Sequence, residues 1–501
     1  ANNTGLGYRA LKSNTTASNN TAVGYLALEE TTTGHSNVGV GKSSMAVNTT
    51  GYENVAVGMV TLDSNTTGAS NTALGHAALS SATTASKNTA VGRYALYLNT
   101  TASNNTAVGY GSLGANTTGT ENTAVGTEAL NATITGSYNT AVGRSALLLN
   151  TGEHNTAVGR IALRTNSSGA DNTALGSRAM YANSSGSSNT AVGVNALDAN
   201  TTASSNTAVG YASLTANTTG ADNVAIGRSA LAANETGHSN ISIGVYSLDA
   251  NSTGIQNTAI GKYALSTNTT GAGNVALGAD ALQASTTGGS NTAIGYNAGG
   301  AITTGQANLC VGYNTGDYQA TLTTGIGNVL VGPYCDVVSG TANDAHAFGY
   351  NLDAASGYTT LGSGGSDIRA AFGNVTWATV SDERYKKDIV DSTAGLSFIN
   401  ALQPRTFKYK TLGELPETFR AYEADSTEVF KSSQTQHGFI AQEIKAAIDA
   451  DSSIADGFKL WDDRSDGSQE VAEAALIPVL TKAIQELSTQ LDAALARITT
   501  L

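Results

Sequence analysis

The motif Asn-Thr-Ala-Val-Gly returns with a fixed period of 17 through most of this chain. Fixed-period self-similarity of this length is typical of a solenoid, in which each repeat forms one coil, or rung, of a stack. The Asn of the motif stands at positions 3, 20, 37, 54, 71, 88, 105, 122 and 139, and then, one residue early, at 155, 172, 189, 206, 223, 240, 257, 274, 291 and 308. The last clear copy begins at Asn328, and a degenerate copy, NDAHAFG, begins at Asn343.

Positions within the repeat differ sharply in residue type. The third residue after the Asn is Val, Leu or Ile, the second is nearly always small, and the fourth is Gly. An apolar anchor follows eight residues after the Asn, from Leu11 to Leu282, and NTTG or NTTAS then supplies a turn. We expect two short strands and two turns per rung, with the branched residue and the anchor forming the core.

A single 17-residue coil cannot bury a core, so the rungs must stack. Stacking aligns like residues and allows hydrogen-bond ladders between successive Asn side chains. At about 4.8 Å per rung, twenty rungs give a rod about 90–100 Å long. The Ala and Gly positions suit close backbone approach, so we expect three such coils to pack together and cover their strand edges.

These residues resemble the head of trimeric autotransporter adhesins, whose rung is Asn-x-(Ala/Val)-(Ile/Val)-Gly. The resemblance implies a trimeric, left-handed parallel β-roll solenoid over residues 1–327. The rung is longer here than in the best-known heads, so larger loops are expected on one side. Similar repeats also occur in phage tail fibres, and the motif identifies the architecture far better than the biological partner.

Residues 328–380 are expected to form an irregular β tip or transition region, and the aromatic character begins already near residue 309. Aromatic side chains near a fibre tip suit stacking on sugars and anchoring of a protein receptor. They equally suit closing the end of the β-roll and packing a trimer. The candidate receptor-contact residues are Tyr313, Tyr318, Tyr334, Tyr350, Tyr358 and Trp377.

Charge and composition exclude several classes of protein. The net charge of −13 and the lack of a Lys/Arg stripe argue against a nucleic-acid partner. The longest apolar runs fall short of the roughly 20 residues that span a bilayer, so no membrane insertion is expected. Two cysteines make no disulfide framework, and the six histidines lack metal-ligand spacing, so we expect no metal and no cofactor. The sequence starts at Ala1 and is expected to be an excised or processed piece.

The sequence changes character at residue 381. Residues 1–380 contain 30 charged side chains and 52 glycines, whereas residues 381–501 contain 33 charged side chains and five glycines. This second part is expected to be a small α+β domain, with a helix–Pro–strand over LSFINALQPRTFKYK and a strand–helix over HGFIAQEIKAAI. A long helix over about 474–501 ends the chain. Apolar residues alternate at steps of four and three along it, which predicts a coiled-coil seam at Leu480, Ile484, Leu487, Leu491, Ala494, Ile498 and Leu501.

Four blocks, SDERYK, ALQPRTFKYK, HGFIAQEI and LTKAIQEL, occur in this order and resemble the intramolecular chaperone domain of phage tailspikes and fibres. The endosialidase tailspikes carry the best-known example. The resemblance implies a trimeric chaperone over residues 381–501 that assembles the preceding stalk and then cuts itself off. The family dyad maps onto Ser381 and Lys386, with cleavage between Val380 and Ser381. Asp382 and Arg384 are candidates for orienting this loop.

The chemistry of such a dyad is reasonable on its own terms. A serine needs a base, and a lysine amine can serve when it is uncharged. A cut at the serine's own amide needs no bound substrate, since the chain itself delivers the carbonyl. On a helix, residues five apart diverge by roughly 140°, so Ser381 and Lys386 must meet through a turn or across subunits.

The sequence therefore favours a homotrimeric phage tail fibre, located on the virion, that binds a host-surface glycan or protein receptor and attaches to an upstream tail or baseplate protein. Its only enzymatic activity would be intramolecular self-cleavage by the Ser-Lys dyad. A bacterial trimeric surface adhesin, located on the cell surface, is the alternative. A glycan depolymerase is a minor alternative, because the shaft offers only scattered acidic residues and no paired carboxylates.

Overall fold

The computed structural model describes residues 2–364, 366–373, 378–379, 381, 383–419, 421–452, 454, 458–463 and 467–499. The chain divides into two compact units, Ala1–Val380 and Ser381–Leu501, which are described separately. The first unit is mainly β and the second contains a long terminal helix.

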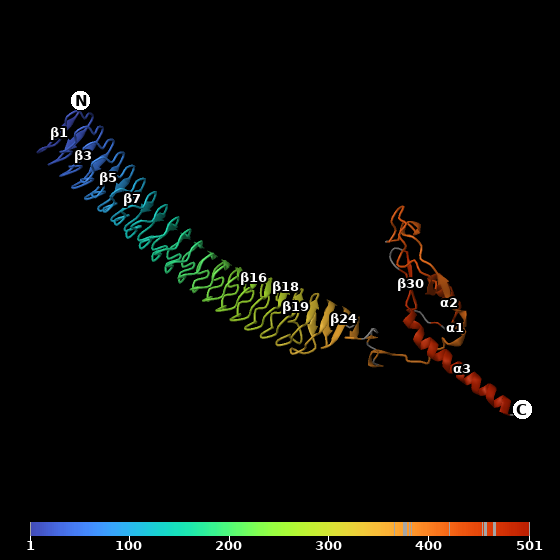
Figure 1. Ribbon diagram of the computed structural model, residues 1–501. Helices are drawn as coiled ribbons and strands as arrows, with labels where there is room; N and C mark the ends of the chain where they lie inside the picture. Colours follow the sequence, from blue (N-terminus) through green and yellow to red (C-terminus); the bar gives the residue numbers. More distant parts are fainter. Residues whose placement is uncertain are drawn as a thin grey trace. The chain divides into compact units, whose positions relative to one another are not determined.

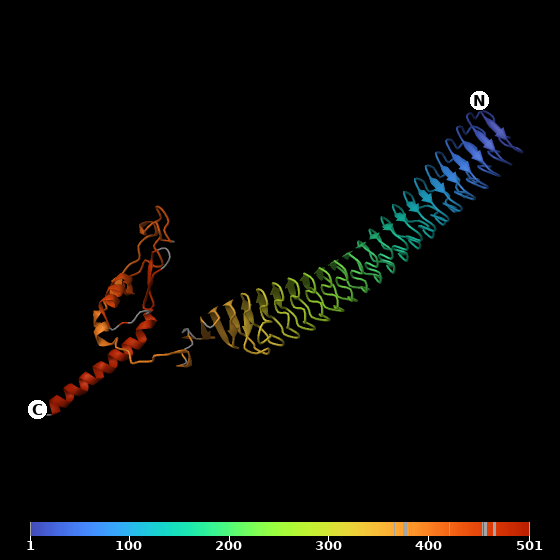
Figure 2. The same cartoon turned by 180° about the vertical axis from the view of Figure 1, so that it is seen from behind.

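The first unit is a solenoid whose turns stack from β1 to β24 (Figures 1 and 2). Each turn contributes one short strand that pairs in parallel with the strand of the next rung, as Ala22 does with Gly39. The first twenty strands are β1 (Thr4–Leu6), β2 (Thr21–Val23), β3 (Val38–Val40), β4 (Val55–Val57), β5 (Thr72–Leu74), β6 (Thr89–Val91), β7 (Thr106–Val108), β8 (Thr123–Val125), β9 (Thr140–Val142), β10 (Thr156–Val158), β11 (Thr173–Leu175), β12 (Thr190–Val192), β13 (Thr207–Val209), β14 (Val224–Ile226), β15 (Ile241–Ile243), β16 (Thr258–Ile260), β17 (Val275–Leu277), β18 (Thr292–Ile294), β19 (Leu309–Val311) and β20 (Val329–Val331).

The repeat predicted from the sequence is confirmed as the repeat of the fold, with about 21 turns at a spacing of 17 residues. The expectation of two strands per rung was wrong, because the segment around the anchor Leu forms successive turns instead of a second strand. Two rungs depart from the period. Strand β10 pairs Thr156 with Thr140 of β9, one residue short of the period, and β20 pairs Val329 with Leu309 of β19, three residues beyond it.

Beyond β20 the regular stack changes. Strand β22 (His346–Tyr350) and then β24 (Tyr358–Ser363) continue the parallel order, while β25 (Ser366–Ala371) and β26 (Ala378–Thr379) add in antiparallel fashion. A second small pair, β21 (Asp336–Val337) and β23 (Asp353–Ala354), lies beside them.

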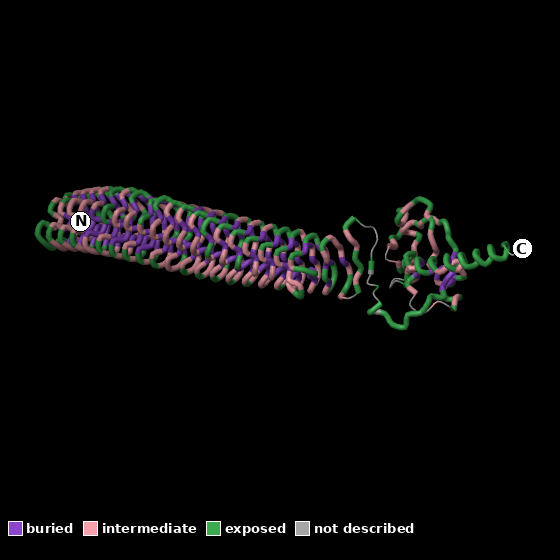
Figure 3. The backbone as a smooth tube through the Cα atoms, turned by 90° about the horizontal axis from the view of Figure 1, so that it is seen from below, coloured by how far each residue is buried: buried purple, intermediate pink, exposed green. Residues whose placement is uncertain are grey.

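The core of the solenoid is built from alanine and leucine. Buried positions follow its length from one end to the other (Figure 3). In a typical rung the middle strand residue Ala90 and the anchor Leu96 are fully buried, together with Ala95. The branched residue that we expected in the core points outward instead, so that Val57 and Ile226 stay 37% and 38% exposed. The coil is narrow, and only a small side chain fits between the strand and the anchor.

In most rungs three residues other than glycine adopt positive φ. In one rung these are Lys87 (φ 58°), Tyr94 (φ 62°) and the anchor Leu96 (φ 51°). This region costs a side-chain-bearing residue about 1–2 kcal/mol. Each of the three amides donates to a carbonyl of an adjacent rung, at 3.0, 3.2 and 3.0 Å. The conformation of a rung is therefore stabilised by its neighbours and not by its own sequence.

Two ladders of buried asparagines link the rungs. In the first, the motif Asn accepts the backbone N–H of the Asn one rung on, as Asn189 does from Asn206 at 2.9 Å. In the second, the Asn of the NTTG turn donates to the equivalent Asn of the preceding rung, as Asn183 does to Asn166 at 2.8 Å. Both ladders match the prediction from the sequence.

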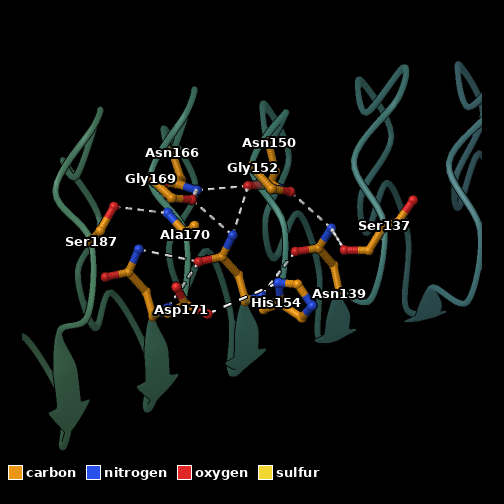
Figure 4. Close-up of polar contacts among 12 residues, drawn as sticks. Ser137, Asn139, Asn150, Gly152, His154, Asn166, Gly169, Ala170, Asp171 and Ser187 are labelled. Carbon is orange, nitrogen blue, oxygen red and sulfur yellow. Dashed lines mark hydrogen bonds and ion pairs between the residues drawn. The ribbon is translucent and has the colours of Figure 1, made fainter.

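The 16-residue rung keeps the first ladder intact, and the second ladder resumes at its Asn150 after Thr133 takes the place of the Asn in the rung before. Its missing residue is taken from the turn, so Asn150 donates to the carbonyl of Gly152 two residues on, whereas Asn166 reaches Gly169 three residues on. Asn166 still donates to Asn150 at 2.6 Å across the shortened turn (Figure 4). The deletion is absorbed locally and the stack continues in register.

We expect Asn183→Ala to destabilise the shaft by about 2–4 kcal/mol, because Asn166, the carbonyl of Gly186 and Asn200 each lose a buried partner. The reverse change is available at Ala82, where the ladder is interrupted and Asn65 Oδ1 has no partner among the described residues. Ala82→Asn should stabilise the shaft by about 1 kcal/mol. Thermal unfolding followed by circular dichroism measures both, and equal midpoints for the two variants would contradict the ladder's contribution.

The second unit is a small α+β domain. The expected helix, Pro break and strand are found as α1 (Leu396–Ala401) and β27 (Arg405–Phe407), and the expected strand–helix as β28 (Gln436–Gly438) and α2 (Ala441–Ala450). Strands β27 and β28 pair in antiparallel fashion. The remaining elements are the short helices η1 (Glu383–Tyr385), η2 (Leu412–Glu414) and η3 (Glu473–Ala475), the antiparallel pair β29 (Trp461–Asp463) and β30 (Gln469–Val471), and the terminal helix α3 (Leu476–Thr499).

Helix α3 has two apolar faces. One, with Leu476, Val479 and Ala483, is buried in the domain core against Phe398. The other remains exposed in this chain; its members are Ile477, Leu480, Ile484, Leu487, Leu491, Ala494 and Ile498. The exposed face contains the described part of the predicted seam, and Leu501 lies outside the described residues.

Candidate functional site

The first residue of the second unit carries the candidate nucleophile. Lys386 Nζ donates a hydrogen bond to Ser381 Oγ at 2.8 Å. The intervening η1 makes this contact, because its tight turn, closed by Lys386 N–H to the carbonyl of Glu383 at 2.9 Å, brings back a side chain five residues along. Of the two routes that the spacing left open, the structure shows the turn within one chain.

Both side chains of this pair are exposed in the single chain. A lysine acts as a base only when its amine is uncharged, and removal from water is what favours that form. The two side chains therefore lie at a distance suited to proton transfer. Because both are exposed to water in the single chain, a further protein surface would have to cover them to exclude it. Arg384 lies in η1 and Lys387 follows Lys386, both exposed. Val380 and Asp382 lie outside the described residues.

Tyrosines gather into one cluster near the end of the solenoid. Tyr296 stacks on Tyr313 at 5.4 Å between ring centroids, and Tyr334 contacts Tyr313, Tyr318 and Tyr350 at 5.4, 4.7 and 5.8 Å. We call these five residues the tyrosine cluster. Burial among its neighbours, and then the nearby phenols, raise the pKa of Tyr334. Four of the sequence-predicted aromatic residues thus come together.

The other two predicted aromatics are not part of this cluster as described. Tyr358 lies under the guanidinium of Arg369, at 5.3 Å from its ring centroid. Trp377 lies outside the described residues. Sequence reasoning missed Tyr296, although it follows the motif glycine in the same slot that Tyr313 takes in the next rung.

Asp336 was also missed. It is fully buried, and its Oδ2 accepts the backbone N–H groups of Tyr318, Gln319 and Ala320 at 3.0, 2.8 and 3.2 Å. A carboxylate bound by several N–H groups holds a loop firmly. No local sequence pattern indicates this role of Asp336, because the carboxylate and the N–H groups that it binds are 16–18 residues apart in the chain.

The remaining candidate groups have structural surroundings. Cys310 and Cys335 are buried free thiols, and burial raises the pKa of Cys310 to about 12. No three metal-ligating side chains converge among the residues that the structure describes. Within the same described part of the chain, no helix has both the length and the apolarity to cross a bilayer.

The chain was compared with models of known protein families. Residues 381–451 match the family model described as chaperone of endosialidase. The match begins at Ser381, the first residue of the second compact unit. Searches of curated proteins and of solved structures gave no match.

Proposed function

We propose that this chain is a phage tail fibre or tailspike that assembles as a homotrimer and cleaves itself between Val380 and Ser381. The chaperone-family match and the β-solenoid together fit a tailspike or fibre with a C-terminal chaperone. One observation carries the proposal further. The residue at which the second unit and the family match both begin is the residue whose Oγ lies 2.8 Å from a lysine amine.

The conformation of the rungs supports the need for an assembly helper. Most rungs hold three non-glycine residues at positive φ, and the amides of these residues bond to adjacent rungs, as in the rung of Lys87, Tyr94 and Leu96. The first rungs to form therefore lack the neighbouring rungs whose hydrogen bonds offset the backbone strain. The stack then grows by adding one coil at a time. A trimeric domain that folds quickly at one end would raise the local concentration of three shafts and align them.

Two unpartnered apolar surfaces support oligomerisation. Along the shaft, the outward Val, Ile and Leu side chains form a stripe that includes Val125, Leu175 and Ile260, exposed by 37%, 46% and 40%. Along α3, the exposed seam repeats in heptads. Ile at one seam position and Leu at the next is the pattern of two-stranded coiled coils. The proposal of three chains therefore rests on the chaperone family's association with trimeric tail proteins.

The proposed cleavage proceeds by an acyl shift. The uncharged Lys386 amine takes the proton of Ser381 Oγ, and Oγ attacks the carbonyl carbon of Val380. The C–N bond breaks, the Ser381 nitrogen takes up a proton, and an ester joins Val380 to Oγ. Water then hydrolyses the ester, leaving a carboxylate on Val380 and the free amine and hydroxyl of Ser381.

The exposure of the dyad makes a test possible. If a neighbouring copy supplies the dry surroundings for Lys386, cleavage requires assembly. We expect Leu487→Asp combined with Leu491→Asp to give a monomer that stays uncut, because charge in the seam abolishes coiled-coil packing. Light scattering coupled to size-exclusion chromatography gives the oligomeric state, and denaturing gels give the cleavage.

The matched control is Gln485→Asp, an exposed position of α3 outside the seam, which should assemble and cleave like the wild type. A wild-type chain that is monomeric would contradict the proposed assembly. Normal cleavage in the dispersed seam variant would show that one copy is sufficient and would remove the link between assembly and cutting.

In the assembled fibre the shaft would contact the host surface and an upstream tail or baseplate protein would hold it on the virion. The tyrosine cluster supports a receptor contact near the end of the shaft, because exposed aromatic rings are favoured anchors of binding sites. Its members Tyr313, Tyr318 and Tyr350 are 46%, 47% and 52% exposed.

A further inference from the structure

A pocket adjoins the tyrosine cluster. It encloses about 270 Å³ and is lined by Gln319, Asn351, Leu352, Asp353, Gly364 and Asp367. Two of these residues are the chain neighbours of cluster members, Gln319 of Tyr318 and Asn351 of Tyr350. The pocket, lined mainly by amides and carboxylates, therefore begins at positions directly next to two of the tyrosines in the chain.

The loop that joins the two features is held in advance of any ligand. Asp336 binds the N–H groups of Tyr318, Gln319 and Ala320 through one oxygen, and the N–H of Val337 through the other at 2.8 Å. Strand β21, which contains Asp336, pairs with β23, which begins at the pocket residue Asp353. A site that is ordered before binding loses less entropy when the ligand arrives.

The chemistry of the surface selects the class of ligand. Aromatic rings stack on the apolar C–H faces of a sugar, while carboxylates and amides pair with its hydroxyl groups. Partial burial, and then the nearby Asp336, raise the pKa of Asp353. A negatively charged ligand would therefore be disfavoured next to this carboxyl group. Together with a chain net charge of −13, the two aspartates disfavour sulfated, phosphorylated or sialylated ligands.

Another copy of the chain is a poor occupant of this surface. Packing it against a protein interface would take Asp353 and Asp367 out of water, and a buried carboxylate without a partner costs several kcal/mol. The outward Val and Ile stripe along the shaft offers a copy an apolar contact without that cost. A sugar instead brings hydroxyl groups that satisfy both carboxylates.

We propose that the tyrosine cluster and the adjoining pocket form a binding site for an uncharged saccharide at the end of the shaft. The inference rests on the proposed fibre function, which gives this end of the shaft a glycan-bearing surface to contact. Tyr334, at the centre of the cluster, stacks against the sugar, and Asp353 accepts hydrogen bonds from its hydroxyl groups.

Binding of the full-length assembled protein to an array of immobilised neutral and anionic oligosaccharides tests this site. We expect at least one neutral oligosaccharide to bind, with sialylated and sulfated members negative. Tyr334→Ala and Asp353→Asn should each weaken that binding at least tenfold. Two control variants, Tyr263→Ala in an aromatic pair further along the shaft and Asp222→Asn at an exposed turn, should bind like the wild type.

Light scattering and the cleavage gel are run on every variant, so failure of the site is separated from failure of the fibre. An assembled, cleaved wild type that binds no saccharide overturns the site and leaves the proposed fibre standing. Preferential binding of anionic saccharides, or equal binding by Tyr334→Ala and Tyr263→Ala, also overturns it. Loss of assembly in Tyr334→Ala would identify the cluster as an interface between copies and would equally overturn the saccharide site.

Discussion

A Ser381→Ala chain is expected to remain at its full length of 501 residues, whereas the wild type is expected to give pieces of 380 and 121 residues. The substitution removes the oxygen that lies 2.8 Å from Lys386 Nζ and leaves no nucleophile to attack the preceding carbonyl. Because the reaction is a single intramolecular event, its loss should be complete within the time of expression. Denaturing gels and intact mass measurement distinguish the two outcomes.

Two lysine variants make this experiment specific. Lys386→Met keeps an unbranched side chain, one atom shorter, but has no amine, so it should also stay uncut, while Lys387→Ala should be cut normally. An unchanged cut in Ser381→Ala, or a mass that places the cut elsewhere, would remove the dyad from the mechanism.

The second large effect is expected from Gly210→Ala in the middle of the shaft. Gly210 has a φ of +135°, and a Cβ atom there would lie 2.5 Å from the carbonyl oxygen of Gly227 in the next rung. The conformation alone costs about 1–3 kcal/mol in a residue with a side chain. Since the backbone of the next rung cannot move without breaking its own ladder, we expect a destabilisation of at least about 3 kcal/mol.

The effect should be local along the shaft, because each rung contacts only its neighbours. Hydrogen exchange read by mass spectrometry should show lost protection around residues 207–227, and limited proteolysis should cut there. The control is Gly39→Ala, which adds the same methyl group at the strand centre, where most rungs already carry alanine. Its Cβ would meet Leu28 Cγ at 3.2 Å, a contact that a small shift relieves. Equal effects from the two changes would refute the backbone argument.

The sequence determined the stacking but not which face of the strand lies inside. A period of 17 and an invariant anchor were sufficient to predict the rungs, their register and the Asn ladders. Alternation along a strand defines two faces, but it does not show which of them points into the core. We assigned the larger apolar residue to the core, whereas the narrow coil places a small residue opposite the anchor, as at Ala90 and Leu96.

In the candidate sites, too, some features could be predicted from the sequence and others could be found only in the structure. The dyad was named through the resemblance to the phage chaperone domain, and because its members lie within six consecutive residues, their contact needed only a turn. The tyrosine cluster joins residues from several rungs, and Tyr296 could have been found, since the predicted register places it beside Tyr313 one rung on. The pocket combines loops that are distant in the sequence, such as those of Gln319 and Asp353, and no local pattern indicates it.

The 16-residue rung between Asn139 and Asn155 has a consequence for how identical shafts align. Uniform rungs are interchangeable, so two copies displaced by one rung would meet nearly the same side chains. The shortened turn at Asn150 and the 20-residue step after Asn308 occur at single heights. A displaced copy would set a long turn against a short one at those heights. In the proposed trimer, these two irregularities would make the arrangement in which all rungs are aligned different in energy from every shifted arrangement.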